Sequence, residues 1–201
     1  MAKQIKSKKR VVDYGEVYTN KREVNAMLDL VSEEASNITS TFLEPACGNG
    51  NFIIEILKRK MITVKSISSS PWDLAINTLK ALSTVYGVDI QEDNVEECRV
   101  RVSKYLMDTL GETLCRYSPV FYKQWFSIVN EILSYNLICG NTLTGTTASG
   151  SDLRFSEWLI HNNGRVIRKD QLFSDILLGE ANYVDETSYR TLCDISLQTF
   201  A

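Results

Sequence analysis

The sequence is poor in proline and histidine, and its cysteines lack the spacing of a metal site. The only histidine, His161, argues against a histidine-based metal centre or a hydrolase triad. The five cysteines are an odd set with no C-x-x-C pair, so we expect reduced thiols rather than disulfides or bound zinc. No apolar run approaches the roughly 20 residues that cross a bilayer, and no apolar signal stretch opens the chain. We therefore expect a cytoplasmic protein with no membrane contact.

Length and charge suggest one acidic domain with a basic start. The 201 residues are 44% apolar, which is enough for a single core. The net charge is −3 and residues 1–10 contribute +5, so the rest of the chain carries −8. We expect residues 1–10 to be a basic flexible arm. An acidic body cannot hold phosphates over a wide surface, so any contact with DNA must come largely from elsewhere.

Apolar periodicity predicts helices interleaved with three short strands. The strands are expected at 41–43, 85–90 and 136–141, and the helices at 20–31, 52–57, 72–82, 92–110, 121–133 and 171–178. Gly111 suits the end of the fourth helix. Asn162-Asn163-Gly164, between 153–159 and 165–168, predicts a hairpin. This order favours an α/β fold with a parallel sheet, whose ligand site lies in the turns after residues 43, 88 and 139.

The predicted turns carry groups that suit a nucleoside ligand. Gly48 and Gly50 allow close approach of the backbone before a helix. Ile53 stands where a dinucleotide fingerprint needs a small residue, which disfavours a pyrophosphate ligand. Asp89 can accept both hydroxyls of a ribose, and the Asn141 amide can pair with an adenine edge. Asn141 also suits a plain turn, because asparagine tolerates left-handed backbone.

Four stretches resemble the AdoMet-dependent amino DNA methyltransferases of restriction-modification systems, particularly the adenine-N6 group. In family order they are Gly15-Glu16-Val17-Tyr18-Thr19, Phe42-Leu43-Glu44-Pro45-Ala46-Cys47-Gly48-Asn49-Gly50-Asn51-Phe52, Gly87-Val88-Asp89-Ile90 and Cys139-Gly140-Asn141-Thr142-Leu143. Asn20 stands where the family usually has proline, and Asn141 replaces the commoner aspartate. Asp89 follows Gly50 by 39 residues, a long interval that we assign to an insertion at 61–83.

The resemblance implies S-adenosyl-L-methionine as cofactor and a Rossmann-like class I methyltransferase sheet, incomplete, with a C-terminal hairpin and helix. It assigns the AdoMet-binding domain to 11–143 and a C-terminal extension to 144–201. The implied cofactor-binding residues are Tyr18, Thr19, Glu44, Ala46, Gly48, Gly50, Asn51, Phe52, Asp89, Ile90, Asn141 and Thr142.

The catalytic motif of that family is missing from the sequence. It places Asn, Asp or Ser before Pro-Pro and an aromatic residue, and this chain has no Pro-Pro pair. Ser118-Pro119-Val120-Phe121 is only similar and precedes the third strand. We therefore expect no catalytic residue here, and a chain that binds AdoMet while a partner subunit carries catalysis and target recognition. Two alternatives are a non-catalytic regulatory subunit of a restriction system and a stand-alone methyltransferase acting on a non-DNA substrate.

The missing motif also leaves the predicted sheet without its next strand. In the fold that the resemblance implies, the strand before the glycine turn lies mid-sheet, so its second edge needs a cover. Either the hairpin around Gly164 folds back on this edge, or a partner protein supplies a strand. We expect the partner.

Overall fold

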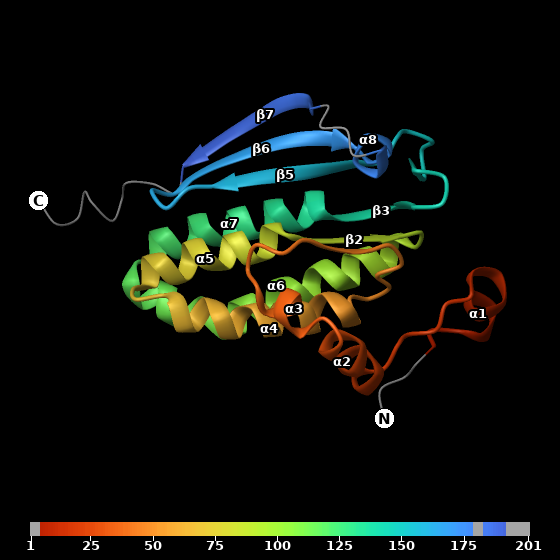
Figure 1. Cartoon of the computed structure of the whole chain (residues 1–201), viewed down its shortest axis with the longest axis horizontal. Coiled ribbons are helices and arrows are strands. Elements are labelled where there is room, and N and C mark those ends of the chain that lie inside the picture. The colour runs from red at the N-terminus through yellow and green to blue at the C-terminus, as the bar shows by residue number, and fades with distance from the viewer. Residues whose placement is uncertain (1–4, 179–182, 192–201) are drawn as a thin grey trace, which may run out of the picture.

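The computed structural model describes residues 5–178 and 183–191 of the chain. Figure 1 shows an α/β arrangement in three layers, with an antiparallel sheet over a middle layer of strands and helices, and further helices below. The helices are α1 (Lys8–Tyr14), α2 (Lys21–Asp29), α3 (Ser32–Ser36), α4 (Asn51–Ile67), α5 (Pro71–Ser83), α6 (Glu92–Tyr117), α7 (Pro119–Asn136) and α8 (Phe173–Leu178). The strands are β1 (Phe42–Glu44), β2 (Val85–Asp89), β3 (Leu137–Asn141), β4 (Thr146–Thr147), β5 (Arg154–Ile160), β6 (Arg165–Leu172) and β7 (Tyr183–Thr191).

The first sheet is mostly parallel, as the sequence predicts. Its order is β1-β2-β3-β4, in which β1, β2 and β3 run parallel and the short β4 is antiparallel to β3. Phe42 is in register with Val85, and Gly87 with Leu137. The carboxyl ends of the three parallel strands therefore lie together at one end of the sheet.

Two helices connect each pair of parallel strands. α4 and α5 lie between β1 and β2, which accounts for the long interval between Gly50 and Asp89. Ser70 caps α5, and Pro71 occupies its first turn, where a missing N–H costs nothing. The prediction that Gly111 ends the next helix is wrong, because α6 continues to Tyr117. Gly111 lies inside the helix, where the Tyr122 ring of α7 packs against it.

The middle strands have apolar residues on both faces. Val85 and Leu137 face the main helical core, whereas Val88 belongs to a second apolar cluster with Leu153 and Phe155. This alternation is the period of two expected for a strand covered on both sides.

The C-terminal segment forms an antiparallel sheet, not a hairpin alone. β5 and β6 pair across a turn at Gly164, whose φ is +85°, and β7 adds a third strand that the sequence analysis did not predict. β6 also takes residues 171 and 172, which we assigned to the last helix. The sheet lies over a face of the first sheet: the Tyr86 hydroxyl donates to the Ser156 carbonyl (2.8 Å). The suggestion that the hairpin covers the strand edge is therefore wrong, since it covers a face.

A buried lysine joins the helical layer to the start of β1. Lys60 of α4 is completely buried, and its ammonium donates to the carbonyls of Asn37 (2.8 Å) and Ser40 (2.6 Å) and to the Thr84 hydroxyl (2.9 Å). Burial lowers the pKa of Lys60 to about 8. These bonds give the buried ammonium three acceptors and tie α4 to the segment before β1.

Within the described ranges, none of the helices combines the length and the apolar character that a bilayer crossing requires.

Candidate functional site

A cavity of about 570 Å³ opens at the carboxyl ends of the parallel strands. Its volume lies in the range of sites for small molecules and cofactors. Its walls come from the segment before α2, from the turn between β1 and α4, and from the ends of β2 and β3. The lining residues are Gly15, Glu16, Val17, Tyr18, Thr19, Glu44, Pro45, Ala46, Cys47, Gly48, Asn49, Asn51, Phe52, Asp89, Ile90, Gln91, Gly140, Asn141, Thr142 and Leu143. All residues of the predicted site line this cavity except Gly50.

Gly50 does not line the cavity but precedes α4, next to lining residues Asn49 and Asn51. It caps α4 in a left-handed conformation with a φ of +88°. A Cβ there would come within 2.4 Å of the Cys98 sulfur on α6. Gly48 is also left-handed, at a φ of +50°, and a Cβ there would press on the Tyr18 ring at 3.2 Å. Both positions therefore require glycine, for backbone conformation and for space.

Asp89 holds the glycine turn in place. Its Oδ2 accepts a hydrogen bond from the Gly48 N–H (2.9 Å). Its Oδ1 accepts from the Gln91 N–H (2.9 Å) and from the Asn94 side-chain amide (3.2 Å). The residue Asp89 is only 9% exposed. It is thus a clamp between two strand ends as well as a candidate ligand group.

The segment from Gly15 to Thr19 closes one side of the cavity. The Tyr18 hydroxyl donates to Asn94 Oδ1 (2.8 Å), and the Asn51 side chain donates to the Thr19 carbonyl (2.8 Å). Asn94 Nδ2 also donates to Glu16 Oε2 (3.0 Å). Sequence reasoning missed Glu16 and Asn94 as site residues. Neither stands at a strand end, and only the folded chain brings them together.

Basic residues near the N-terminus anchor this segment to α6. Lys6 forms ion pairs with Asp93 (2.9 Å) and Glu97 (3.0 Å), and Arg10 pairs with Asp93 (2.6 Å) and Glu16 (2.7 Å). The Arg10 guanidinium, then Lys6, hold the pKa of Asp93 well below its usual range. Of the arm expected at 1–10, Lys6 and Arg10 are therefore bound to the body, and residues 1–4 lie outside the described ranges.

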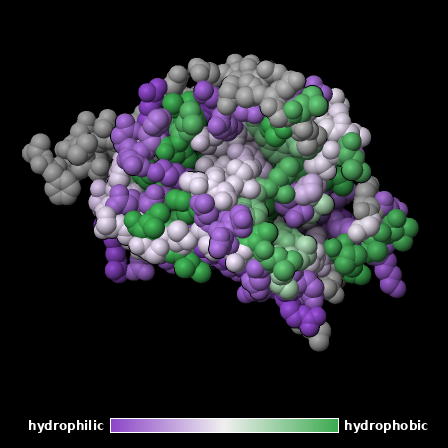
Figure 2. Space-filling model, viewed as in Figure 1, coloured by the Kyte–Doolittle hydropathy of each residue, from purple (hydrophilic) through white to green (hydrophobic). Residues whose placement is uncertain are grey.

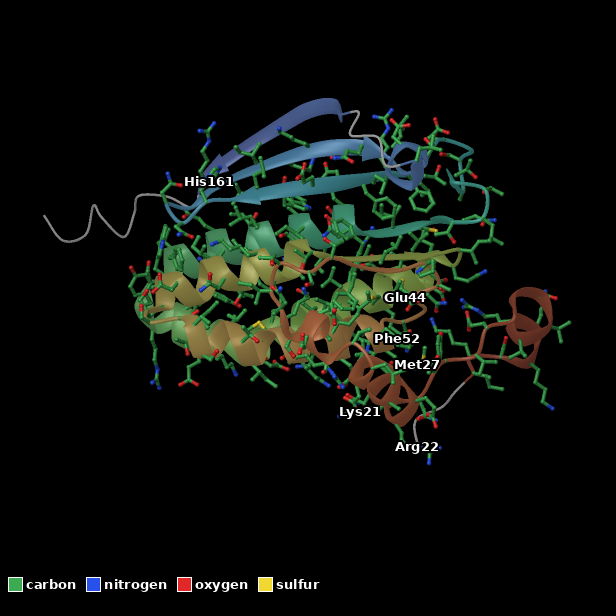
Figure 3. All side chains as sticks on the ribbon, viewed as in Figure 1. Lys21, Arg22, Met27, Glu44, Phe52 and His161 are labelled. Carbon is green, nitrogen blue, oxygen red and sulfur yellow. The ribbon has the colours of Figure 1, made fainter. Side chains whose placement is uncertain are left out.

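Glu44 lies at the end of β1. Of the three carboxylates that line the cavity, it accepts the fewest hydrogen bonds from the described residues. Burial raises its pKa above the ordinary value, and a weak bond from the Ala46 N–H (3.3 Å) opposes that shift. Glu44 and Phe52 both line the cavity, and Figure 3 shows them at the same end of the molecule. A cavity with a carboxylate and an aromatic ring in its walls suits a ligand that carries a positive charge.

The third strand ends in a tight turn. Asn141 Oδ1 accepts a hydrogen bond from the Leu143 N–H (2.9 Å), so this oxygen stabilises the turn. Among the described residues, no side chain or backbone group accepts a hydrogen bond from the Asn141 amide nitrogen. The Thr142 hydroxyl donates to the Pro45 carbonyl (3.2 Å) and links this turn to the first one. The role of Asn141 in binding adenine stays a prediction.

Buried cysteines pack under the glycine turn. A hydrogen bond with the Cys98 thiol, together with burial, raises the pKa of Cys47 far above its ordinary value. A thiol in that state is a poor nucleophile and a poor metal ligand. Among the described residues, no group of His, Cys, Asp and Glu side chains is arranged to hold a metal ion. Cys47 is thus a small packing residue.

His161, Ser118 and Trp125 do not line the cavity. His161 is exposed at the hairpin, at the opposite end of the molecule from Glu44 in Figure 3. Ser118 caps α7 by accepting from the Phe121 N–H (3.3 Å), so the stretch similar to a catalytic motif is a helix start. Trp125 is fully buried and donates to the Ala75 carbonyl (3.2 Å), as expected for a core residue.

No protein family, curated protein or solved structure matches this chain. The site must therefore be interpreted from its own geometry.

Proposed function

We propose that this chain binds S-adenosyl-L-methionine in the cavity and is the cofactor-binding part of an adenine-N6 DNA methyltransferase. The observation that carries the proposal is the Asp89 clamp on Gly48. This hydrogen bond joins the turn that contains Gly48 and Gly50, where an added Cβ would be crowded, to the carboxylate at the next strand end. In parallel α/β sheets this is where nucleoside ligands bind. The proposed fold is Rossmann-like and of the class I methyltransferase type.

The charges of the cavity suit this ligand. AdoMet has a sulfonium, an ammonium and a carboxylate group, so it is a net cation, and it has no phosphate. Glu16, Glu44 and Asp89 all border the cavity, and its described lining contains no lysine or arginine. A lining with that charge favours a cation and opposes a pyrophosphate.

The second part of the proposal concerns the missing acceptor site. Transfer to an adenine amine needs hydrogen-bond acceptors that free its lone pair and an aromatic ring that stacks on the flipped base. The motif that supplies both is absent from the sequence. We therefore assign catalysis and DNA recognition to a partner chain.

Calorimetry with AdoMet, ATP and NAD tests the cofactor assignment. We expect AdoMet to bind and the two phosphate-bearing ligands not to bind. Asp89→Ala removes a charged acceptor and releases Gly48, so we expect AdoMet affinity to fall about ten- to a hundredfold, which corresponds to roughly 1.5–3 kcal/mol. The proposal is contradicted if wild-type protein shows no AdoMet binding, or if Asp89→Ala binds AdoMet with unchanged affinity.

A further inference from the structure

One of the residues that line the cavity has a buried carboxylate oxygen that the described residues leave without a partner. It is Oε1 of Glu16, whose side chain is 7% exposed. The other oxygen of the same carboxylate, Oε2, accepts from Arg10 (2.8 Å) and from Asn94 (3.0 Å). A buried charged oxygen without a donor is costly, so such a position is expected to receive one when the site is filled.

The Asp89 carboxylate has few free acceptor positions for the hydroxyls of a ribose. A carboxylate offers roughly four lone-pair positions. The donors Gly48 N, Gln91 N and Asn94 Nδ2 occupy three of them. A vicinal diol that donates two hydrogen bonds therefore needs a second acceptor close to Asp89.

Glu16 is placed to be this acceptor. Asn94 Nδ2 donates to Glu16 Oε2 and to Asp89 Oδ1 at once, at 3.0 and 3.2 Å, so one amide group joins the two carboxylates. Asn49 Oδ1 is also buried and unpaired among the described residues. Its amide nitrogen donates to Glu97 (2.9 Å), however, and among the described residues no hydrogen bond joins Asn49 to Asp89. An amide oxygen is also the weaker acceptor.

Resting on the function proposed above, we propose that Glu16 Oε1 and Asp89 divide the ribose diol of the ligand between them, each accepting from one hydroxyl. Glu16 then makes the site selective for ribose over deoxyribose. It also connects the ligand to the N-terminal segment, because its other oxygen holds Arg10.

The test measures the affinities of S-adenosylhomocysteine and its 2′-deoxy and 3′-deoxy analogues for wild type, Glu16→Gln and Arg10→Gln. The glutamine keeps the size of the side chain and removes its charge. We expect Glu16→Gln to weaken S-adenosylhomocysteine about tenfold or more and to leave one of the two deoxy analogues unchanged. Arg10→Gln is the matched control, because it breaks the same ion pair without touching Oε1.

The outcomes distinguish a Glu16 that binds the ribose from a Glu16 that only holds the N-terminal segment. A Glu16→Gln loss that is equal for all three ligands, and that Arg10→Gln reproduces, means that Glu16 only anchors the segment and overturns the inference. Unchanged affinity in Glu16→Gln also overturns it, while AdoMet binding stands. Wild-type protein that binds none of these ligands refutes the proposed function, and this inference with it. Glu16→Asp, which keeps the carboxylate, replaces the glutamine variant if that variant does not fold.

Discussion

At the scale of single residues, the site is a set of carboxylates with different amounts of internal pairing. Asp93 is saturated by Arg10 and Lys6, and Asp89 is largely occupied by backbone N–H groups. Glu44 has one weak bond. A carboxylate with many donors in the protein stabilises the fold, whereas one with few donors can accept a hydrogen bond or an ion pair from a ligand.

The first residue-scale prediction concerns Glu44 and pH. Burial raises the pKa of Glu44 above 4.5, and a cationic ligand favours its ionised form. AdoMet affinity should therefore be greatest above that raised pKa. It should fall as the pH drops through it, by up to about tenfold per pH unit.

Glu44→Gln should flatten this pH profile, as measured by calorimetry across the acidic range. Glu112→Gln is a matched control, because the side chain of Glu112 is 78% exposed on α6 and lies outside the cavity. An equal pH profile in Glu44→Gln and wild type would show that Glu44 is not near the charge of the ligand.

At the scale of elements, the glycine turn depends on the helix behind it. Gly50 is the cap before α4, and the Cys98 side chain, 48 residues later on α6, leaves no space for a Cβ there. The local sequence predicts a turn with glycines. It does not contain the reason that the second glycine cannot be replaced.

Gly50→Ala should therefore lower the free energy of unfolding by more than the strain of a left-handed backbone accounts for. A left-handed alanine costs roughly 1–2 kcal/mol, and the overlap with Cys98 adds to that cost. Gly145→Ala is the matched control, since Gly145 has a φ of +69° and open space around it. Thermal unfolding should show a larger loss for Gly50→Ala than for Gly145→Ala.

The double variant Gly50→Ala with Cys98→Ala should recover part of this difference, because it removes the sulfur but not the backbone strain. Equal losses for the two glycine variants would mean that α4 and α6 move apart easily.

At the scale of the whole molecule, one edge of the first sheet is open. Among the described residues no strand pairs with the outer side of β1. A groove of about 280 Å³ lies beside it, and Figure 2 shows apolar surface near this part of the face. The groove is lined by Thr41, Leu43, Tyr86, Phe155, Ser156, Glu157, Gln171, Phe173 and Ile176. A partner strand added at this edge would lie next to the cavity.

The purified chain alone should transfer no methyl group to DNA. The reason is the absence of the acceptor motif together with a body charge of −8 over residues 11–201. Transfer of tritium from labelled AdoMet to DNA is the measurement, with and without the product of the neighbouring gene. Methyl transfer to DNA by the isolated chain contradicts the assignment of catalysis to a partner chain. Activity of the isolated chain on a non-DNA substrate favours the stand-alone alternative.

Leu43→Arg should reduce co-purification with that gene product at least tenfold, because Leu43 lies on β1, is 42% exposed and lines the groove. Ile62→Arg is the control, since Ile62 is 73% exposed on α4 and lies outside the groove. If both variants retain the partner, the edge of β1 is not the contact. If wild type does not co-purify with it, the split enzyme is refuted.

The sequence by itself determined the local features of this protein. Apolar periodicity and polar turns gave the three parallel strands, the helices between them and the Gly164 turn, because these depend on neighbours a few residues apart. It also predicted a site at the strand ends, where Asp89 and Gly48 meet because parallel strands end on the same side.

Only the tertiary structure decided the features that depend on contacts between residues far apart in the sequence. Gly111 looks like a helix end, but packing against Tyr122 makes it an interior residue. β7 has no signal strong enough to predict it before β6 is present to pair with it. Glu16 and Asn94 come together across 78 positions of sequence through one hydrogen bond. Contacts of that range are set by packing of the whole chain, and no local pattern of residues contains them.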